Sequence, residues 1–110
     1  MVRIAPDGSF DVYPPDRRSA QAYGLAVDGC GRVVYNDFRH DRMLILDPAA
    51  NRRTEVRIPT PGAVARKVVV DAERQWAWFA LAETARIGWL RLPPCGVTLG
   101  RPVDVERHEP

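Results

Sequence analysis

Residues 22–48, AYGLAVDGCGRVVYNDFRHDRMLILDP, align with residues 65–93, ARKVVVDAERQWAWFALAETARIGWLRLP. Asp28 corresponds to Asp71, and Arg42 corresponds to Arg86, so the two stretches repeat with a period of roughly 43 to 44 residues. A repeat of this length is typical of both propeller blades and helical arrays. The local pattern within each stretch therefore decides the fold class.

Short segments rich in β-branched and aromatic residues make up both stretches, and turn residues such as Asp28-Gly29-Cys30-Gly31 separate them. Helices of useful length do not fit between these turns. The predicted strands are 24–28, 31–35, 42–47 and 53–58 in the first unit, and 66–71, 75–79, 86–91 and 102–107 in the second. Four antiparallel strands per unit make one propeller blade, so the sequence predicts an all-β chain of four-stranded antiparallel blades.

The chain is expected to divide into three parts. Residues 1–20 contain VRIAPDGSFDVYPP, which parallels the end of the first unit, and are predicted to be outer strands of a preceding blade. Residues 21–62 are predicted to form one blade, and residues 63–110 a second blade with a C-terminal tail. About two and a half blades do not close a ring, so we expect an incomplete ring with exposed blade faces and unpaired strand edges.

Composition excludes two classes of partner. The formal net charge is +2 and the basic residues are spread along the chain, without the basic stripe that nucleic-acid binding requires. No apolar run approaches the ~20 residues of a membrane span. The N-terminus, MVRIAPDGSF, lacks the apolar core of a secretory signal, so a cytoplasmic location is expected. Cys30 and Cys95 lie far apart and are expected to be two unpaired thiols in a reducing cytosol.

The two aligned stretches resemble the repeat of the streptogramin lyases (virginiamycin B lyases), which runs P-x-G-I-A-V-D-x-x-G-x-V-W-F-T-E-x-x-x-N-R-I-G-R-L-D-P. The resemblance spans about residues 2 to 92. Regucalcin-like and gluconolactonase-like propellers and NHL-type repeats share parts of the pattern and remain alternatives for the fold family. The resemblance implies a seven-bladed ring in full-length members, and a magnesium-dependent carbon–oxygen lyase that linearises a cyclic depsipeptide antibiotic.

Three residues are expected at the mouth of the central channel, where the start of the inner strand meets the end of the second strand: Tyr23, Asp37 and Arg66. The resemblance implies a histidine general base before the inner strand, but Tyr23 and Arg66 occupy that position here. It also implies glutamates that hold magnesium after the second strand, where this chain has Asp37 and Leu81. Asp37 is therefore the candidate metal ligand, with a loop cap as the alternative. Asn36 beside it and, after a loop shift of two residues, Glu83 are further ligand alternatives, with a solvated loop charge as the other interpretation of Glu83. No catalytic residue is predicted.

The remaining polar and aromatic residues receive structural interpretations. His40 and His108 are expected to be surface histidines without a fixed carboxylate partner, and no hydrolase or kinase motif is present. Trp78 and Phe79 are expected to pack between blades, so that Trp78→Ala would destabilise the protein by ~3–5 kcal/mol. They are not expected to form a ligand cage.

Three functions remain open at this point. The first is a non-catalytic or incomplete propeller segment that binds a small molecule or another protein, or is a remnant. The second is the magnesium-dependent lyase of the resemblance, and the third is a regucalcin-like or gluconolactonase-like metal-binding propeller. A small-molecule ligand and a homo-oligomer whose copies complete a ring together both remain open as partners.

Overall fold

The computed structural model describes residues 1–97 and 99–110, and every regular element in these ranges is a β-strand. The strands are β1 (Val2–Ile4), β2 (Phe10–Val12), β3 (Leu25–Val27), β4 (Val33–Asp37), β5 (Arg42–Asp47), β6 (Arg52–Arg57), β7 (Ala65–Asp71), β8 (Trp76–Leu81), β9 (Arg86–Arg91), β10 (Arg101–Pro102) and β11 (Glu106–His108). Within the described part of the chain, no helix is long and apolar enough to cross a membrane.

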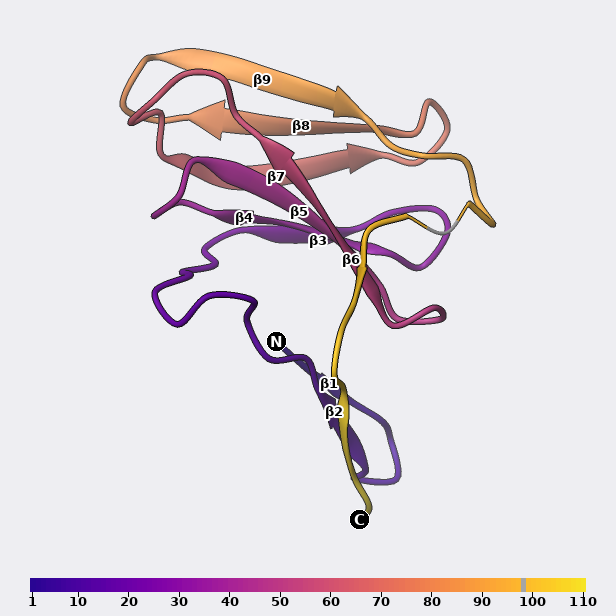
Figure 1. Cartoon of the computed structure of the whole chain (residues 1–110). Coiled ribbons are helices and arrows are strands. Elements are labelled where there is room, and N and C mark those ends of the chain that lie inside the picture. Colours follow the sequence, from indigo (N-terminus) through magenta and orange to yellow (C-terminus); the bar gives the residue numbers. More distant parts are fainter. Residues whose placement is uncertain (98) are drawn as a thin grey trace.

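The strands form three antiparallel sheets, in the orders β1-β2-β11, β10-β6-β5-β4-β3 and β7-β8-β9. In the second and third sheets, β3 to β6 and β7 to β9 lie next to one another in chain order, as in the blades of a propeller. Figure 1 shows the β7–β9 sheet lying over the β3–β6 sheet, while β1, β2 and β11 project away from both. The predicted all-β fold of antiparallel blades is confirmed, and the ring is not closed.

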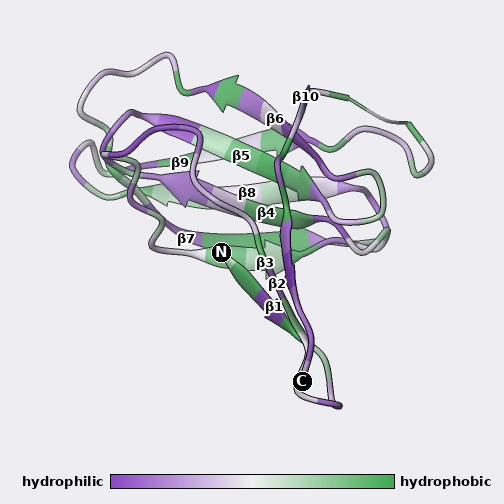
Figure 2. Ribbon diagram, turned by 60° about the horizontal axis from the view of Figure 1, so that its bottom comes forward, coloured by the Kyte–Doolittle hydropathy of each residue, from purple (hydrophilic) through white to green (hydrophobic). Residues whose placement is uncertain are grey.

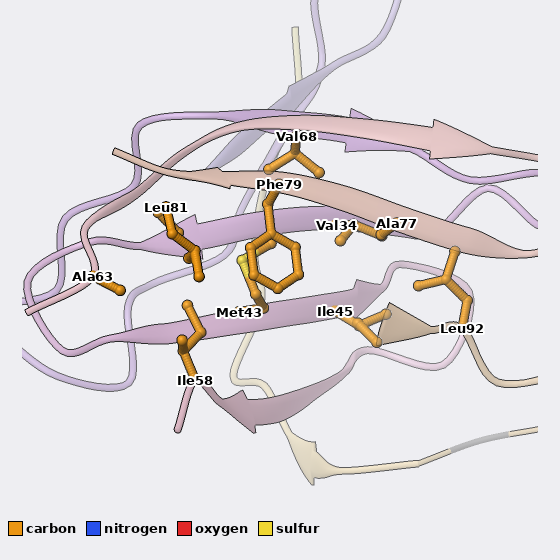
Figure 3. Packing of buried hydrophobic residues seen from close by; sticks show 11 residues of the cluster. Val34, Met43, Ile45, Ile58, Ala63, Val68, Ala77, Phe79, Leu81 and Leu92 are labelled. Atoms are coloured by element: carbon orange, nitrogen blue, oxygen red, sulfur yellow. The ribbon is translucent and has the colours of Figure 1, made fainter. Parts of the chain in front are cut away.

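Alternation along the strands builds the core between the two blades. In β8, Ala77, Phe79 and Leu81 are buried, whereas Trp78 and Ala80 between them are exposed. Figure 3 shows the Phe79 ring between the blades, with Met43 beneath it and Val68 above it. Residues packed in this cluster come from both sheets and their connections: Val34, Met43, Ile45, Ile58, Ala63, Ala65, Val68, Ala77, Phe79, Leu81 and Leu92.

A second cluster covers the opposite face of the β3–β6 sheet. It consists of Tyr13, Tyr35, Leu44 and Leu46, and Val103 and Val105 of the tail pack against it. Figure 2 shows this tail running from β10 to the C-terminus, where β11 pairs with β2. The N-terminal segment and the tail thus take the place of a neighbouring blade on part of this face.

The tail differs from its prediction. We expected 102–107 to be the fourth strand of the second blade, but β10 pairs with β6 of the first blade through Arg101↔Arg53. β11 pairs with β2, so that Glu106 lies opposite Val12. The β7–β9 sheet therefore has three strands among the described residues, because the tail leaves it after Pro93 and Pro94 and pairs with segments far away in sequence.

The location of Trp78 also corrects an expectation. Phe79 is 7% exposed in the interblade core, but Trp78 is 38% exposed and faces away from it. Neighbouring residues of a strand point to opposite faces, so only one of the two can enter this core. The large cost expected for Trp78→Ala therefore applies to Phe79 in this structure.

Cys30 and Cys95 form a disulfide, with their Cα atoms 5.5 Å apart, so the expectation of two unpaired thiols is wrong. The turn that carries Cys30 is held by Asp28, whose Oδ1 accepts hydrogen bonds from the backbone amides of Cys30 and Arg32. The guanidinium of Arg32 pairs with Asp28 and donates a hydrogen bond to the backbone carbonyl of Pro93. The fold thus brings together two cysteines that the sequence separates by 65 residues.

Candidate functional site

Asn36 and Asp37 are the last two residues of β4, and their side chains point to opposite faces of the sheet. The Asn36 side chain is fully buried and faces the second blade, where its Nδ2 donates hydrogen bonds to the carbonyl oxygens of Ala65 (2.7 Å) and Arg66 (2.5 Å). Its Oδ1 accepts hydrogen bonds from the backbone amides of Tyr23 (2.8 Å) and Gly24 (3.1 Å). The Asn36 amide thus joins the second blade through Nδ2 and holds the start of the inner strand of its own blade through Oδ1.

Asp37 is 1% exposed, and its carboxylate accepts four hydrogen bonds. Oδ1 accepts from the backbone amides of Gln21 (3.0 Å) and Arg39 (3.2 Å). Oδ2 is bonded to His40 Nδ1 (2.7 Å) and Arg42 Nε (2.9 Å). Burial raises the pKa of Asp37, but these hydrogen bonds outweigh burial, and the net pKa lies below its usual value.

Arg42 extends this network to the N-terminal segment. Its guanidinium is fully buried and donates hydrogen bonds to both carboxylate oxygens of Asp16, at 2.6 and 2.7 Å. These bonds lower the pKa of Asp16 to about 2. The buried charge of Arg42 is thus paired with the carboxylates of Asp16 and Asp37, and a carboxylate oxygen of Glu55 lies 3.8 Å from it. No sequence signal distinguished Arg42 from an ordinary strand residue, because Asp16 lies 26 positions away.

The structure brings Tyr23 and Arg66 to one edge, but through their backbones. Asn36 bridges the Tyr23 amide and the Arg66 carbonyl, and Gly24 lies so close to that carbonyl that a side chain at position 24 would collide with it. The Tyr23 ring is 70% exposed and meets Phe38 edge-on at 6.3 Å. The Arg66 guanidinium is exposed and lies 3.8 Å from a Glu83 carboxylate oxygen.

Asp37 does not share this exposed edge. Its side chain points to the other face of the sheet, towards Arg42. A magnesium ion bound to Asp37 would have to displace Arg42 or the histidine, and no group of three or more His, Cys, Asp or Glu suited to a metal occurs within residues 1–97 and 99–110. The residues present therefore do not fit a magnesium ion in this arrangement, and the ligand role of Asp37 stays a prediction.

His40 has the carboxylate partner that sequence reasoning denied it. It lies three residues after Asp37, in the loop between β4 and β5, and its ring nitrogen Nδ1 lies 2.7 Å from Asp37 Oδ2. On the other side of the ring, Nε2 lies 3.1 Å from Ser19 Oγ. The Asp-x-x-His spacing in a tight loop could have indicated the contact between His40 and Asp37. Nothing in the sequence indicated the contact with Ser19, which lies 21 residues before His40.

A cavity of 270 Å³ adjoins this network. Its wall includes Ala20 and the charged residues Asp16, Asp37 and Arg53, and apolar side chains supply much of the remainder. These are Met1, Tyr13, Leu25, Tyr35 and Leu44. The cavity thus connects an apolar lining with the polar groups around Asp37.

Fold and site together define a segment of a β-propeller with a buried polar network at a strand end. Two solved structures show the same fold: a streptogramin B lyase (18% identity, TM-score 0.61, covering 78% of this chain and 32% of that one) and a virginiamycin B lyase from Staphylococcus aureus (18%, 0.58, 99% and 39%). A catalytically inactive form of the S. aureus enzyme with quinupristin is similar as well (13%, 0.58, 84% and 40%).

These identities establish a likeness of fold alone. The chain spans between about a third and two-fifths of the length of these lyases. No protein-family profile matches the sequence, and no curated protein matches it.

Proposed function

We propose that this chain is an incomplete propeller segment of the streptogramin-lyase type that acts by binding, and that its protein partner is a second copy of itself. Two observations argue against the lyase activity. Tyr23 and Arg66 occupy the positions of the family's general base. The Asp37 carboxylate is paired with the Arg42 guanidinium, where a magnesium ion would have to bind. Binding is preferred because of one observation, the uncovered outer face of the β7–β9 sheet.

That outer face is apolar across all three strands. Val69, Trp78 and Trp89 lie opposite one another in register and are 55%, 38% and 50% exposed. Trp76 adds to the group, with its ring 4.9 Å from that of Trp89, and Ile87 is 75% exposed. A contiguous group of exposed tryptophans and aliphatic side chains is typical of an interaction surface.

A second exposed apolar surface lies at the opposite end of the two-blade stack, where the N-terminal segment and the tail leave part of β3 uncovered. Leu25 and Val27 of β3 are 57% and 59% exposed and share the face of the sheet that is turned away from β7–β9. When one face of a copy binds a different face of the next copy, the contact is heterologous and generates a ring if the rotation closes. Propellers close with about 4–8 blades, so about three chains would suffice.

The test is the mass in solution by multi-angle light scattering. We expect an assembly of about three chains, which Trp89→Glu reduces to the monomer because a carboxylate would be buried in the contact. Glu73→Lys, at an exposed turn beside this face, is the matched control and should leave the mass unchanged. A monodisperse, cooperatively folding monomer of the unmodified protein, or a mass that Trp89→Glu does not change, would refute self-association through this face.

The cytoplasmic location expected from the N-terminal residues stays a proposal. The Cys30–Cys95 disulfide bears on it directly, because a reducing cytosol keeps most thiols reduced. Rapid alkylation of the protein in intact cells, followed by mass spectrometry, tests it: blocked thiols would support the cytoplasm, and a preserved bridge would point to an oxidising compartment.

A further inference from the structure

Ser19, His40 and Asp37 form a line of hydrogen bonds in the order of a nucleophile, a base and an orienting carboxylate. Ser19 Oγ lies 3.1 Å from His40 Nε2, and His40 Nδ1 lies 2.7 Å from Asp37 Oδ2. Ser19 belongs to the segment between β2 and β3, whereas the other two residues belong to the end of β4 and the loop after it. This constellation arises from tertiary contacts and has no counterpart in a sequence motif.

The order of the contacts sets the proton positions. A buried carboxylate beside Nδ1 favours the tautomer that carries its hydrogen on Nδ1, which leaves the lone pair of Nε2 free to accept the Ser19 hydroxyl proton. Asp37 is itself held in place by the Gln21 amide and by Arg42. The base therefore has a defined orientation before any substrate binds.

The solvent exposure of the three side chains decreases from Ser19 through His40 to Asp37. Ser19 is exposed, the His40 side chain is 23% exposed, and the Asp37 side chain is 1% exposed. A reagent can therefore reach the hydroxyl while the carboxylate stays shielded from water. The only other serine, Ser9, is fully buried, and its hydroxyl bonds to Asp7 and Arg107 rather than to a histidine.

We propose that Ser19 is a nucleophile activated by His40 and oriented through Asp37, and that it acts on activated esters with an apolar acyl group. This inference goes beyond the binding function proposed above. Leu25 belongs both to the cavity and to the proposed contact face, but the readout here, labelling of Ser19, is distinct from the mass in solution. The apolar acyl group is suggested by the 270 Å³ cavity, whose wall includes Ala20, next to Ser19, and Asp37. Its lining of Tyr13, Leu25 and other apolar side chains suits a short aliphatic or aromatic chain.

The reaction is an acyl transfer in two steps. Ser19 Oγ attacks the acyl carbon while its proton passes to His40 Nε2, the bond to the leaving oxygen breaks, and the leaving group departs as an alcohol or phenol with that proton. Water, deprotonated by His40, then attacks the acyl-serine and releases the carboxylic acid and the free hydroxyl. The constellation of Ser19, His40 and Asp37 does not itself include an oxyanion-hole donor, and each such donor is worth about 10²–10³ in rate. The expected substrates are therefore aryl esters with good leaving groups rather than amides.

A fluorophosphonate probe tests the nucleophile directly. We expect the probe to label Ser19 and not Ser9, with the site identified by peptide mass spectrometry. General-base assistance is typically worth about 10²–10⁴ in rate, so His40→Ala should slow labelling at least about a hundredfold. His108→Ala is the matched control, because His108 stacks on Phe10 at the far end of the molecule and should not alter the labelling rate. No labelling of Ser19, or an equal rate in His40→Ala, would overturn the proposal.

A second measurement separates the serine from a reactive imidazole. With p-nitrophenyl acetate, the unmodified protein should show an acetyl-Ser19 intermediate by mass spectrometry and an initial burst of p-nitrophenol. Ser19→Ala changes one exposed side chain, so the fold should be retained while both signals are lost. Unchanged hydrolysis in Ser19→Ala would assign the reaction to the histidine alone and would refute the nucleophile.

Discussion

The side-chain amide of Asn36 donates a hydrogen bond of 2.5 Å to the backbone carbonyl of Arg66, and so joins the two blades at their edge. The same amide group also donates to the carbonyl of Ala65, and its oxygen accepts from two backbone amides before β3. One fully buried side chain thus fixes the position of β7 relative to the start of β3. The interblade contact is therefore polar at this edge and apolar in its middle, where Phe79 lies.

Replacement of Asn36 by alanine should lower the free energy of unfolding by about 2 kcal/mol or more. A buried group left without its hydrogen-bond partner costs about 1–3 kcal/mol, and Asn36→Ala leaves several such groups on both blades. Urea denaturation followed by tryptophan fluorescence measures the change. Arg66→Ala is the control, because the bond is made to its backbone and its side chain is exposed. A loss as large in Arg66→Ala as in Asn36→Ala would contradict this account.

Phe79 and Trp78 provide a test of the strand register. Phe79→Ala should destabilise the monomer by about 3–5 kcal/mol, since the ring is buried between the blades against Gly88, where no side chain could be added without a collision. Trp78→Ala should cost distinctly less, because its ring is on the outer face. Thermal unfolding at low protein concentration compares the two variants. If Trp78→Ala proved the more damaging, the assigned faces of β8 would be wrong.

Reduction of the Cys30–Cys95 bridge should lower the free energy of unfolding by about 4 kcal/mol, the loop-closure entropy for a separation of 65 residues. Guanidinium denaturation with and without dithiothreitol measures it. The variant Cys30→Ser with Cys95→Ser should unfold at the same denaturant concentration in both buffers. A stability of the unmodified protein that is insensitive to reductant would show that the bridge does not form.

Acid should destabilise the fold through Asp16 and Asp37. Hydrogen bonds from Arg42 lower the pKa of Asp16 to about 2, and hydrogen bonds to Asp37 lower its pKa as well, against the effect of burial. Because the folded-state pKa values lie below those of the unfolded chain, their contribution to stability is complete above about pH 4 and is lost as the pH falls towards 2.

The variant Asp16→Asn isolates one of these carboxylates. It should be less stable than the unmodified protein at pH 6, and its stability should decline less steeply between pH 4 and pH 2. Thermal melts across this range provide the measurement. Parallel pH profiles for the two proteins would mean that Arg42 does not stabilise ionised Asp16.

The sequence by itself determined the strands and their grouping into blades. Alternating apolar residues and Gly- or Asp-containing turns act over a few residues, so β4, β5 and β9 were predicted within one or two residues of their observed bounds. The burial of Phe79 between the blades was also expected, but the same pattern wrongly placed Trp78 there as well.

Only the tertiary structure decided which distant groups meet. The tail pairs with β6 and β2 rather than completing the second blade, Cys95 reaches Cys30, and Asp16 reaches Arg42 across 26 residues. Ser19 meets His40 in the same way. Strand periodicity carries no information about such encounters, because they depend on how two blades and a connecting segment pack, and packing is a property of the whole chain.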